Sequence, residues 1–275
     1  MSKRYAIKWM LGLAVVAGLT GYAPYAPQFV PSGAVAAVAA DPTGDQVLDH
    51  YIEVTGGKAA YEKVKSRVIA GKMSIPAQGI GGDIQMFQKA PNLSYMTITI
   101  PQLGKIERGF NGEVGWEKNP MTGTRVLSGE EKDQMLREAT MNQEVNWREQ
   151  YPKVENVGKE DINGKPAYKI QMTSKKGNEE TRFYDVESGL LVRSQMTVKN
   201  AQGEFPIVAT PSDWREVDGV KMPFKSTQEL KSMGLEQVIA MDKVETNTDI
   251  PDAKFELPED VKSIAKKEPT TQPGK

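Results

Sequence analysis

Residues 95–100 read Tyr95-Met96-Thr97-Ile98-Thr99-Ile100, and apolar and polar side chains alternate along them. In an extended chain, the methionine and both isoleucines would lie on one face, and the tyrosine and both threonines on the other. Such alternation is typical of an antiparallel strand with one face turned to an apolar interior. The stretch therefore predicts a sheet with one apolar side.

The same period of two recurs after residue 66, at 168–173, 190–198 and 235–241. Turn pairs separate the runs and supply the positive φ that tight hairpins need. These pairs are Asn111-Gly112, Asn163-Gly164, Gly177-Asn178, Ser188-Gly189 and Asp218-Gly219. Because strands do not alternate with long helices, a parallel doubly wound sheet is not expected.

Two regions have helical patterns. Within 41–65, apolar residues recur at helical spacing between 47 and 52, Thr43 or Asp45 can cap the start, and Gly56-Gly57 separates a second short helix. Near the middle, Ser128 followed by Glu131 resembles a capping box and predicts a helix over 133–146. Strands with helices at the start and in the middle make an α+β fold.

The N-terminus has the features of an export signal. Lys3, Arg4 and Lys8 precede an uncharged, mostly apolar stretch over 9–23, and small residues follow up to Ala40. That stretch is shorter than the roughly 20 residues that span a bilayer. We expect cleavage after residue 39 or 40, which would deliver the chain to the periplasm; the alternative is an uncleaved membrane anchor.

The remaining chain is interpreted as one domain and a tail. Residues 41–265 contain all the predicted helices and strands, with no visible linker. Residues 266–275 are rich in lysine, proline, threonine and glutamine, a composition typical of a disordered segment.

Composition excludes several function classes. The 275 residues include 35 basic and 36 acidic ones, and without residues 1–40 the acidic residues exceed the basic ones by four, which argues against a nucleic-acid partner. There is no cysteine and His50 is the only histidine, so thiolate or multi-histidine metal sites and disulfides are excluded. We find no phosphate loop and no metal-ligand spacing. We therefore predict no cofactor, no metal, no catalytic residue and no enzymatic activity.

Methionine is prominent on the predicted inward faces. Eleven of the 13 methionines follow residue 40, and Met86, Met96, Met172 and Met196 occupy inward strand positions. Methionine adapts to ligands of irregular shape, so a curved sheet lined in this way could hold acyl chains. The alternative is that the same side chains fill an ordinary core against the helices.

Several segments also resemble, in order, motifs of one family. Residues 82–93 (GDIQMFQKAPNL) look like "G-D-L-x-V-K-R-P-N-L", 109–120 resemble the hairpin "S-D-G-K-x-x-W-x-Y-N-P", and 250–258 resemble the closing "D-x-x-x-F-x-x-x-P". These are motifs of the periplasmic lipoprotein carrier LolA. Residues 184–193 and 214–224 look like hairpins of exported LolA-like proteins, so the resemblance spans about residues 45–262.

The resemblance implies a strongly curved antiparallel sheet, an incomplete barrel, closed by helices over an apolar cavity. In the carrier, the cavity receives acyl chains of lipoproteins from the inner membrane and hands them to an outer-membrane acceptor. The implied partners are a lipid or an acylated lipoprotein, with inner- and outer-membrane envelope proteins. The predicted cavity residues are Met86, Met96, Ile98, Ile100, Trp116, Met172 and Met196, of which Trp116 is placed by the resemblance alone.

One position departs from the family. The arginine that precedes Pro-Asn and helps to hold the carrier's lid shut is Ala90 here, although Lys89 is kept. Alanine has no side-chain donor, so we expect the lid to close through apolar contact from the helix near 135–145. The sequence favours a periplasmic, non-enzymatic LolA-like binding protein or carrier for outer-membrane lipoprotein sorting. A structural envelope module with a filled core is the alternative, and a hydrolase has little support.

Overall fold

The computed structural model describes residues 41–101, 103–200 and 203–266, and of 199 and 200 only the backbone. The predicted signal peptide and nearly all of the predicted tail lie outside these ranges and stay predictions. Within the described ranges, none of the helices combines the length and the apolar character needed to cross a membrane.

The strands form one antiparallel sheet in the order β6-β5-β4-β3-β2-β1-β13-β12-β11-β10-β9-β8-β7. Their bounds are β1 Ser66–Ile75, β2 Ile80–Lys89, β3 Leu93–Ile100, β4 Gly104–Asn111, β5 Gly115–Asn119, β6 Gly123–Val126, β7 Lys153–Ile162, β8 Lys165–Thr173, β9 Glu179–Asp185, β10 Leu191–Asn200, β11 Gly203–Val217, β12 Val220–Leu230 and β13 Leu235–Thr246.

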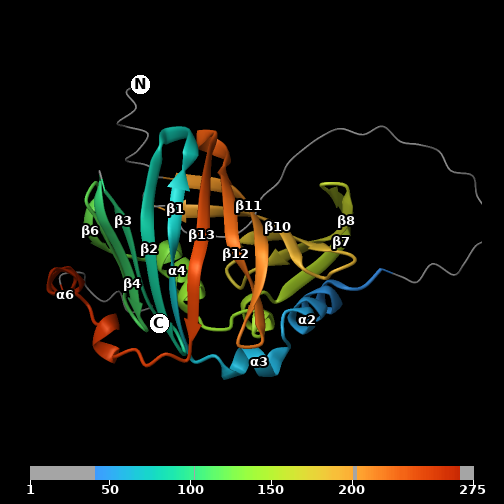
Figure 1. The fold of residues 1–275 in the computed structure, drawn as a ribbon, viewed down its shortest axis with the longest axis horizontal. Coiled ribbons are helices and arrows are strands. Elements are labelled where there is room, and N and C mark those ends of the chain that lie inside the picture. The colour runs from blue at the N-terminus through green and yellow to red at the C-terminus, as the bar shows by residue number, and fades with distance from the viewer. Residues whose placement is uncertain (1–40, 102, 201–202, 267–275) are drawn as a thin grey trace, which may run out of the picture.

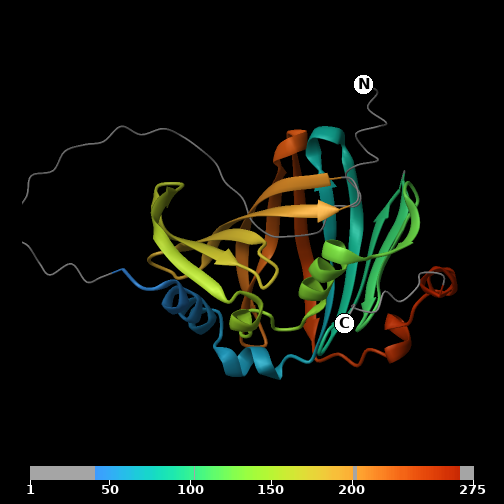
Figure 2. The same ribbon diagram turned by 180° about the vertical axis from the view of Figure 1, so that it is seen from behind.

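Strands β1–β6 form one meander and β7–β13 form another, and within each meander successive strands pair. The pairing of β1 with β13 joins the two meanders. The edge strands β6 and β7 do not pair with each other, so the sheet stays open. It is strongly curved, and α4 (Gly129–Ala139) lies within its concave side (Figures 1 and 2). The predicted α+β class and curved antiparallel sheet are confirmed.

The hairpins form at the predicted turn pairs. Asn163 and Gly164 have φ of 58° and 81°, and Asp218 and Gly219 have φ of 49° and 81°. Two successive positive φ values are the signature of the tightest hairpin turns, which asparagine, aspartate and glycine tolerate best.

The remaining helical elements are α2 Gly44–Val54, α3 Lys58–Lys63, α5 Trp147–Gln150 and α6 Glu259–Ala265, with the 3-10 turns η1 Pro76–Gln78, η2 Lys231–Met233 and η3 Asp252–Phe255. Thr43 caps α2 as predicted: its Oγ1 accepts the Gln46 N–H at 3.3 Å, while Gln46 Oε1 accepts the Thr43 N–H at 2.8 Å. Two otherwise unpaired donors at the helix start are thereby satisfied.

The middle helix differs from its prediction. Ser128 stands at the N-cap of α4, but its side chain makes no capping hydrogen bond. The helix ends at Ala139, well short of residue 146. The Met141 N–H donates to the Pro91 carbonyl at 2.9 Å, and Asn142, at φ 52°, donates through Nδ2 to the Val64 carbonyl at 3.0 Å. These contacts draw the chain away from the helix axis.

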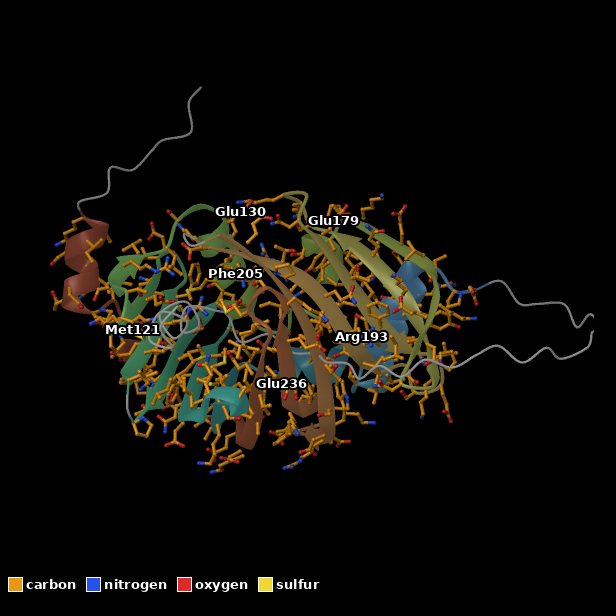
Figure 3. All side chains as sticks on the ribbon, turned by 90° about the horizontal axis from the view of Figure 1, so that it is seen from above. Met121, Glu130, Glu179, Arg193, Phe205 and Glu236 are labelled. Atoms are coloured by element: carbon orange, nitrogen blue, oxygen red, sulfur yellow. The ribbon has the colours of Figure 1, made fainter. Side chains whose placement is uncertain are left out.

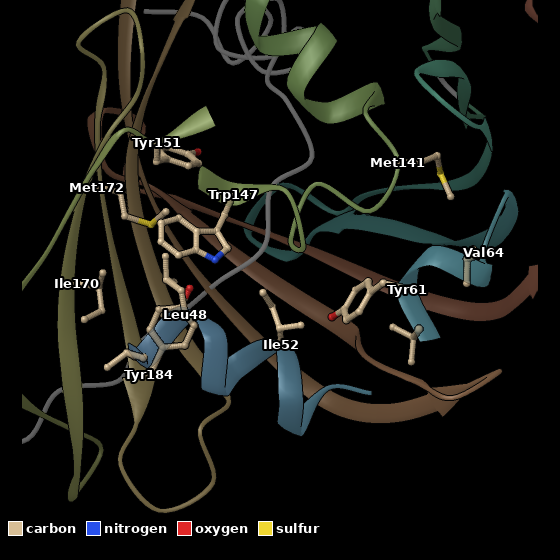
Figure 4. Close-up of a cluster of buried hydrophobic side chains, with 12 residues drawn as sticks. Leu48, Ile52, Tyr61, Val64, Met141, Trp147, Tyr151, Ile170, Met172 and Tyr184 are labelled. Atoms are coloured by element: carbon tan, nitrogen blue, oxygen red, sulfur yellow. The ribbon is translucent and has the colours of Figure 1, made fainter. Parts of the chain in front are cut away.

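Two large clusters of buried side chains fill most of the concave side. The first joins strand residues from β1–β4 to residues from β10–β13, among them Ile98, Ile100 and Ile207. The second packs α2, α3 and α5 against β8, β9 and β12, and Figure 4 shows Leu48, Trp147 and Met172 within it. We call these the strand cluster and the helix cluster.

The C-terminal segment runs along the opposite, convex face. Lys89 Nζ donates to the Ile250 carbonyl at 3.1 Å, and Lys118 forms an ion pair with Asp260 of α6 at 2.6 Å. Lys254 Nζ lies 4.2 Å from the centre of the Phe87 ring. This segment therefore covers the convex face of β2–β6.

Candidate functional site: a cavity beneath α4

A cavity of about 390 Å³ lies between the concave face of the sheet and the α4–α5 segment. Met86, Met96 and Met196, from β2, β3 and β10, form part of its floor, and Met135 of α4 faces them. Met96 and Met196 pack against the strand cluster, whereas Tyr51, at another part of the lining, packs against the helix cluster. The cavity thus extends from one core cluster to the other.

The rim of the cavity is polar. Glu130 at the start of α4 and Glu179 at the start of β9 both line it, and Figure 3 shows them on the same side of the molecule. Glutamate, glutamine and arginine side chains from α4, α5 and β9 also line the cavity. The site is therefore apolar on its floor and polar around its mouth, not apolar throughout as the sequence predicted.

Three of the predicted residues, Met86, Met96 and Met196, meet in this cavity. Strand register explains the first two, because Met86 pairs with Met96 across β2 and β3 and cross-strand partners share a face. Met196 belongs to β10, which is far from β2 and β3 in the sequence, and it reaches the same cavity because the sheet curls. That these side chains bind a ligand stays a prediction.

Ile98, Ile100 and Met172 lie on the concave side but do not line the cavity. Ile98 and Ile100 are buried within the strand cluster. Met172 is fully buried in the helix cluster, where Trp147 and Tyr151 also pack (Figure 4). These three side chains fill the core. The alternative interpretation, an ordinary core packed against the helices, expected this of all the inward side chains.

The predicted position of Trp116 was wrong. Glu117 pairs with Arg108, which lines the cavity, so Trp116, one residue earlier, faces the convex side. Its ring lies 6.1 Å from the Tyr95 ring and against Gly109, where a Cβ atom would come within 2.7 Å of the indole. The hairpin motif indicated that a tryptophan is buried, but not on which face.

Ala90 lies in the contact region between β2 and residues 140–146, which follow α4 and which we call the lid segment. It packs against the helix cluster, and its N–H donates to the Lys65 carbonyl at 2.9 Å. The next residue, Pro91, accepts the Met141 N–H just beyond α4. The position is thus close to the lid segment, with a backbone contact where the resembled family has an arginine.

Polar contacts, rather than apolar contacts alone, hold α4 over the cavity. Gln88, buried two residues before Ala90, donates through Nε2 to the Glu138 carbonyl at 3.1 Å. Arg125 Nη1 bonds both carboxylate oxygens of Glu131 at 2.8 Å. Lys176, in the turn between β8 and β9, pairs with Asp133. The helix is therefore tied to both halves of the sheet, which corrects the expectation of an apolar closure.

A buried carboxylate organises one side of this attachment. Glu117, only 1% exposed, lies 3.4 Å from Arg108 Nε and 3.4 Å from Arg125 Nη2. Arg108 Nη1 in turn lies 3.9 Å from the Glu138 carboxylate of α4. We call Arg108, Glu117, Arg125, Glu131 and Glu138 the α4 ion network. Apolar alternation does not reveal this network, because charged residues interrupt the apolar face of β4 and β5. The signal in the sequence is that Arg108 and Glu117 occupy inward positions where apolar residues would be expected.

A second polar group lies where β9 meets α5. Glu180 accepts a hydrogen bond from the Tyr151 hydroxyl at 2.7 Å and pairs with Arg182 Nε at 2.5 Å. Burial disfavours the charged guanidinium and is the largest single influence on the pKa of Arg182. The charge of Glu180, its hydrogen bond and the nearby Tyr184 and Tyr151 together outweigh burial and keep that pKa well above its usual range. Burial also raises the pKa of the Tyr151 phenol, and the charge of Glu180 adds to this rise. At neutral pH the Tyr151 phenol is therefore neutral and the Arg182 guanidinium is charged.

Similar folds occur among solved structures, although no protein-family model and no curated protein matches the chain. A DUF1329 family protein from Desulfovibrio piger aligns at a TM-score of 0.54 and 14% identity, over 78% of this chain and 97% of that one. A LolA superfamily protein from Nitrosomonas europaea gives 0.54 and 16%, over 79% and 99%. A domain from Vibrio parahaemolyticus, described as outer membrane lipoprotein-sorting, gives 0.53 and 11%, over 77% and 97%.

The fold is LolA-like. The resemblance seen in the sequence motifs is confirmed at the level of the fold. Sequence identities of 11–16% support a shared fold and nothing beyond it.

Proposed function

We propose that the protein is a periplasmic, non-enzymatic carrier or binding protein that holds a lipid or the acyl chains of a lipoprotein in the cavity beneath α4. The observation that carries the proposal is the methionine floor made by Met86, Met96 and Met196 under a helix held by polar contacts. Each methylene moved from water onto such a floor contributes about 0.8 kcal/mol. The LolA-like fold and the predicted export signal support a place in lipoprotein sorting at the envelope.

The direct test is binding of a fluorescent fatty acid to the purified chain. We expect saturable binding at one site per chain, and recovery of a co-purified lipid by mass spectrometry when the protein is isolated from its host periplasm. Absence of both signals from a folded protein would contradict the proposal.

The second candidate is a structural or interaction module of the envelope with a filled core. The burial of Ile98, Ile100 and Met172 in the core clusters favours it, because these side chains offer no surface to a ligand. This candidate predicts a protein that folds normally, binds no fatty acid and carries no lipid.

A further inference from the structure

The cavity joins two chemically different ends. At one end, Met86, Met96 and Met196 offer an apolar surface to an alkyl chain. At the other, Tyr51 of α2 and Trp214 of β11 line the wall. Their ring centroids are 6.4 Å apart and the planes meet at 76°. A ligand that occupied both ends would need a chain and a head of different character.

Some of the charged side chains that line the cavity are already paired with a side chain of opposite charge, and others are not. Five glutamates and three arginines line the cavity. Arg108 lies beside Glu117 at 3.4 Å, and Arg182 is paired with Glu180. Recognition of a phosphate or carboxylate favours arginines whose donors are available, and two of these three arginines are engaged. Among the described residues the third, Arg137, has no such partner, but glutamates outnumber arginines in the lining by five to three. This excess of acidic side chains disfavours an anionic head group.

Glu144 adds a carboxylate to the lining of the same cavity. It lies on the segment between α4 and α5, and among the described residues its carboxylate makes no hydrogen bond or ion pair. After burial, which is the largest cause, the charge of Glu144 contributes to raising the pKa of Tyr51. The carboxylate and the two aromatic rings therefore line the same cavity.

We propose, on the basis of the proposed function, that the cavity selects an amphiphile with an ammonium head group. The alkyl chain lies on the methionine floor, and the ammonium lies between Glu144 and the rings of Tyr51 and Trp214. Aromatic faces attract quaternary ammonium groups, and an uncompensated carboxylate strengthens this preference over a sulfate or phosphate.

Displacement of Nile red by three single-chain amphiphiles tests the proposal. Dodecyltrimethylammonium, dodecyl maltoside and dodecyl sulfate share the same chain and differ in head charge, and each is used below its micelle concentration. We expect the ammonium compound to displace the dye at about tenfold lower concentration than the sulfate. Far-ultraviolet circular dichroism with each compound verifies that the protein stays folded.

Matched variants assign the preference to the cavity. Glu144→Gln removes the carboxylate from the site and should abolish most of the gap between ammonium and sulfate. Glu113→Gln makes the same charge change in the exposed turn between β4 and β5, outside the cavity lining, and should leave the gap intact. Equal displacement by sulfate, or a gap that survives Glu144→Gln, would overturn the head-group assignment while leaving the carrier function standing. Failure of the dye and of all three amphiphiles to bind would overturn both.

Discussion

At the scale of single residues, position within the register decides what each side chain does. Met96 and Met172 both stand at inward positions of alternating strands, yet Met96 lines the cavity and Met172 is fully buried. Alternation predicts on which face of the sheet a side chain lies, but it does not predict whether a helix packs over that side chain. Trp116 shows the same limit, because β5 has five residues and its alternation is too short to identify the inner face.

The two methionines therefore predict opposite effects of truncation. Met172→Ala should lower the free energy of unfolding by about 2–5 kcal/mol, because it leaves a cavity in the helix cluster. Met96→Ala should destabilise the fold less and should weaken fatty-acid binding more. Urea denaturation and fluorescence titration of both variants measure the difference. If Met172→Ala weakened binding while preserving stability, the assigned positions would be incorrect.

Glu117 should be the most sensitive charged residue of the α4 ion network. Removing its charge with Glu117→Gln leaves Arg108 and Arg125 facing each other with less compensation, which we expect to cost about 3 kcal/mol of stability. Glu113→Gln, at an exposed turn, should change stability by less than about 0.5 kcal/mol. Equal unfolding midpoints in urea for the two variants would show that Glu117 is not the centre of a buried network.

At the scale of elements, α4 is positioned by contacts that local sequence does not show. Its hydrophobic stripe and the residue at its N-cap, Ser128, could be predicted, whereas the helix begins at Gly129, earlier than predicted. Its partners Gln88, Arg125 and Lys176 lie on β2, on β6 and in the β8–β9 turn. Gln88 and Lys176 meet the helix only because the sheet curls around it, whereas Arg125 lies six residues before its partner Glu131. The Asn142 contact with Val64 that follows the helix is likewise long-range, so the predicted end at residue 146 was too late.

Loss of the ion pairs should loosen α4 without unfolding the sheet. In the double variant Glu131→Gln/Glu138→Gln, we expect amide hydrogen exchange in α4 to accelerate about tenfold, equivalent to roughly 1.4 kcal/mol. Exchange in β1 and β13 should be unaffected. The double variant Glu113→Gln/Glu149→Gln provides a control with the same change in net charge. Unaltered exchange in α4 would indicate that apolar packing alone holds the helix.

The contact between α2 and α5 should depend on pH. Hydrogen bonds from Arg148 hold the pKa of Asp49 below its usual value. A carboxylate with a lowered pKa in the folded state stabilises above its unfolded pKa of about 3.9, and this contribution is lost as the pH falls through the folded value. Because both side chains are about half exposed, the contribution should stay below about 1 kcal/mol.

Denaturation of the native protein and Asp49→Asn at two pH values measures this contribution. The native protein should be the more stable at pH 7, and the difference should disappear once the pH has fallen below the lowered pKa of Asp49. A difference that persisted in acid would have to arise from packing and not from the carboxylate charge.

At the scale of the whole molecule, the sheet order follows simply from the sequence while its curvature does not. Turn pairs such as Asn163-Gly164 fix hairpins between successive strands, so a meander could be predicted from residues close together in the chain. The pairing of β1 with β13 and the approach of β10 to β2 and β3 join residues more than a hundred positions apart. The cavity exists because of these distant contacts, and in the sequence only the inward methionines and the resemblance to a known family pointed to it.

Photo-crosslinking with a fatty acid that carries a diazirine at its chain terminus tests the central claim most directly. Mass spectrometry of the digested protein locates the labelled peptides. We predict adducts on β2, β3 and β10, which carry Met86, Met96 and Met196, and on α4, with competition by unlabelled fatty acid. Adducts confined to the convex face, around Phe87 and Trp116, or labelling that unlabelled fatty acid does not reduce, would contradict a carrier cavity beneath α4.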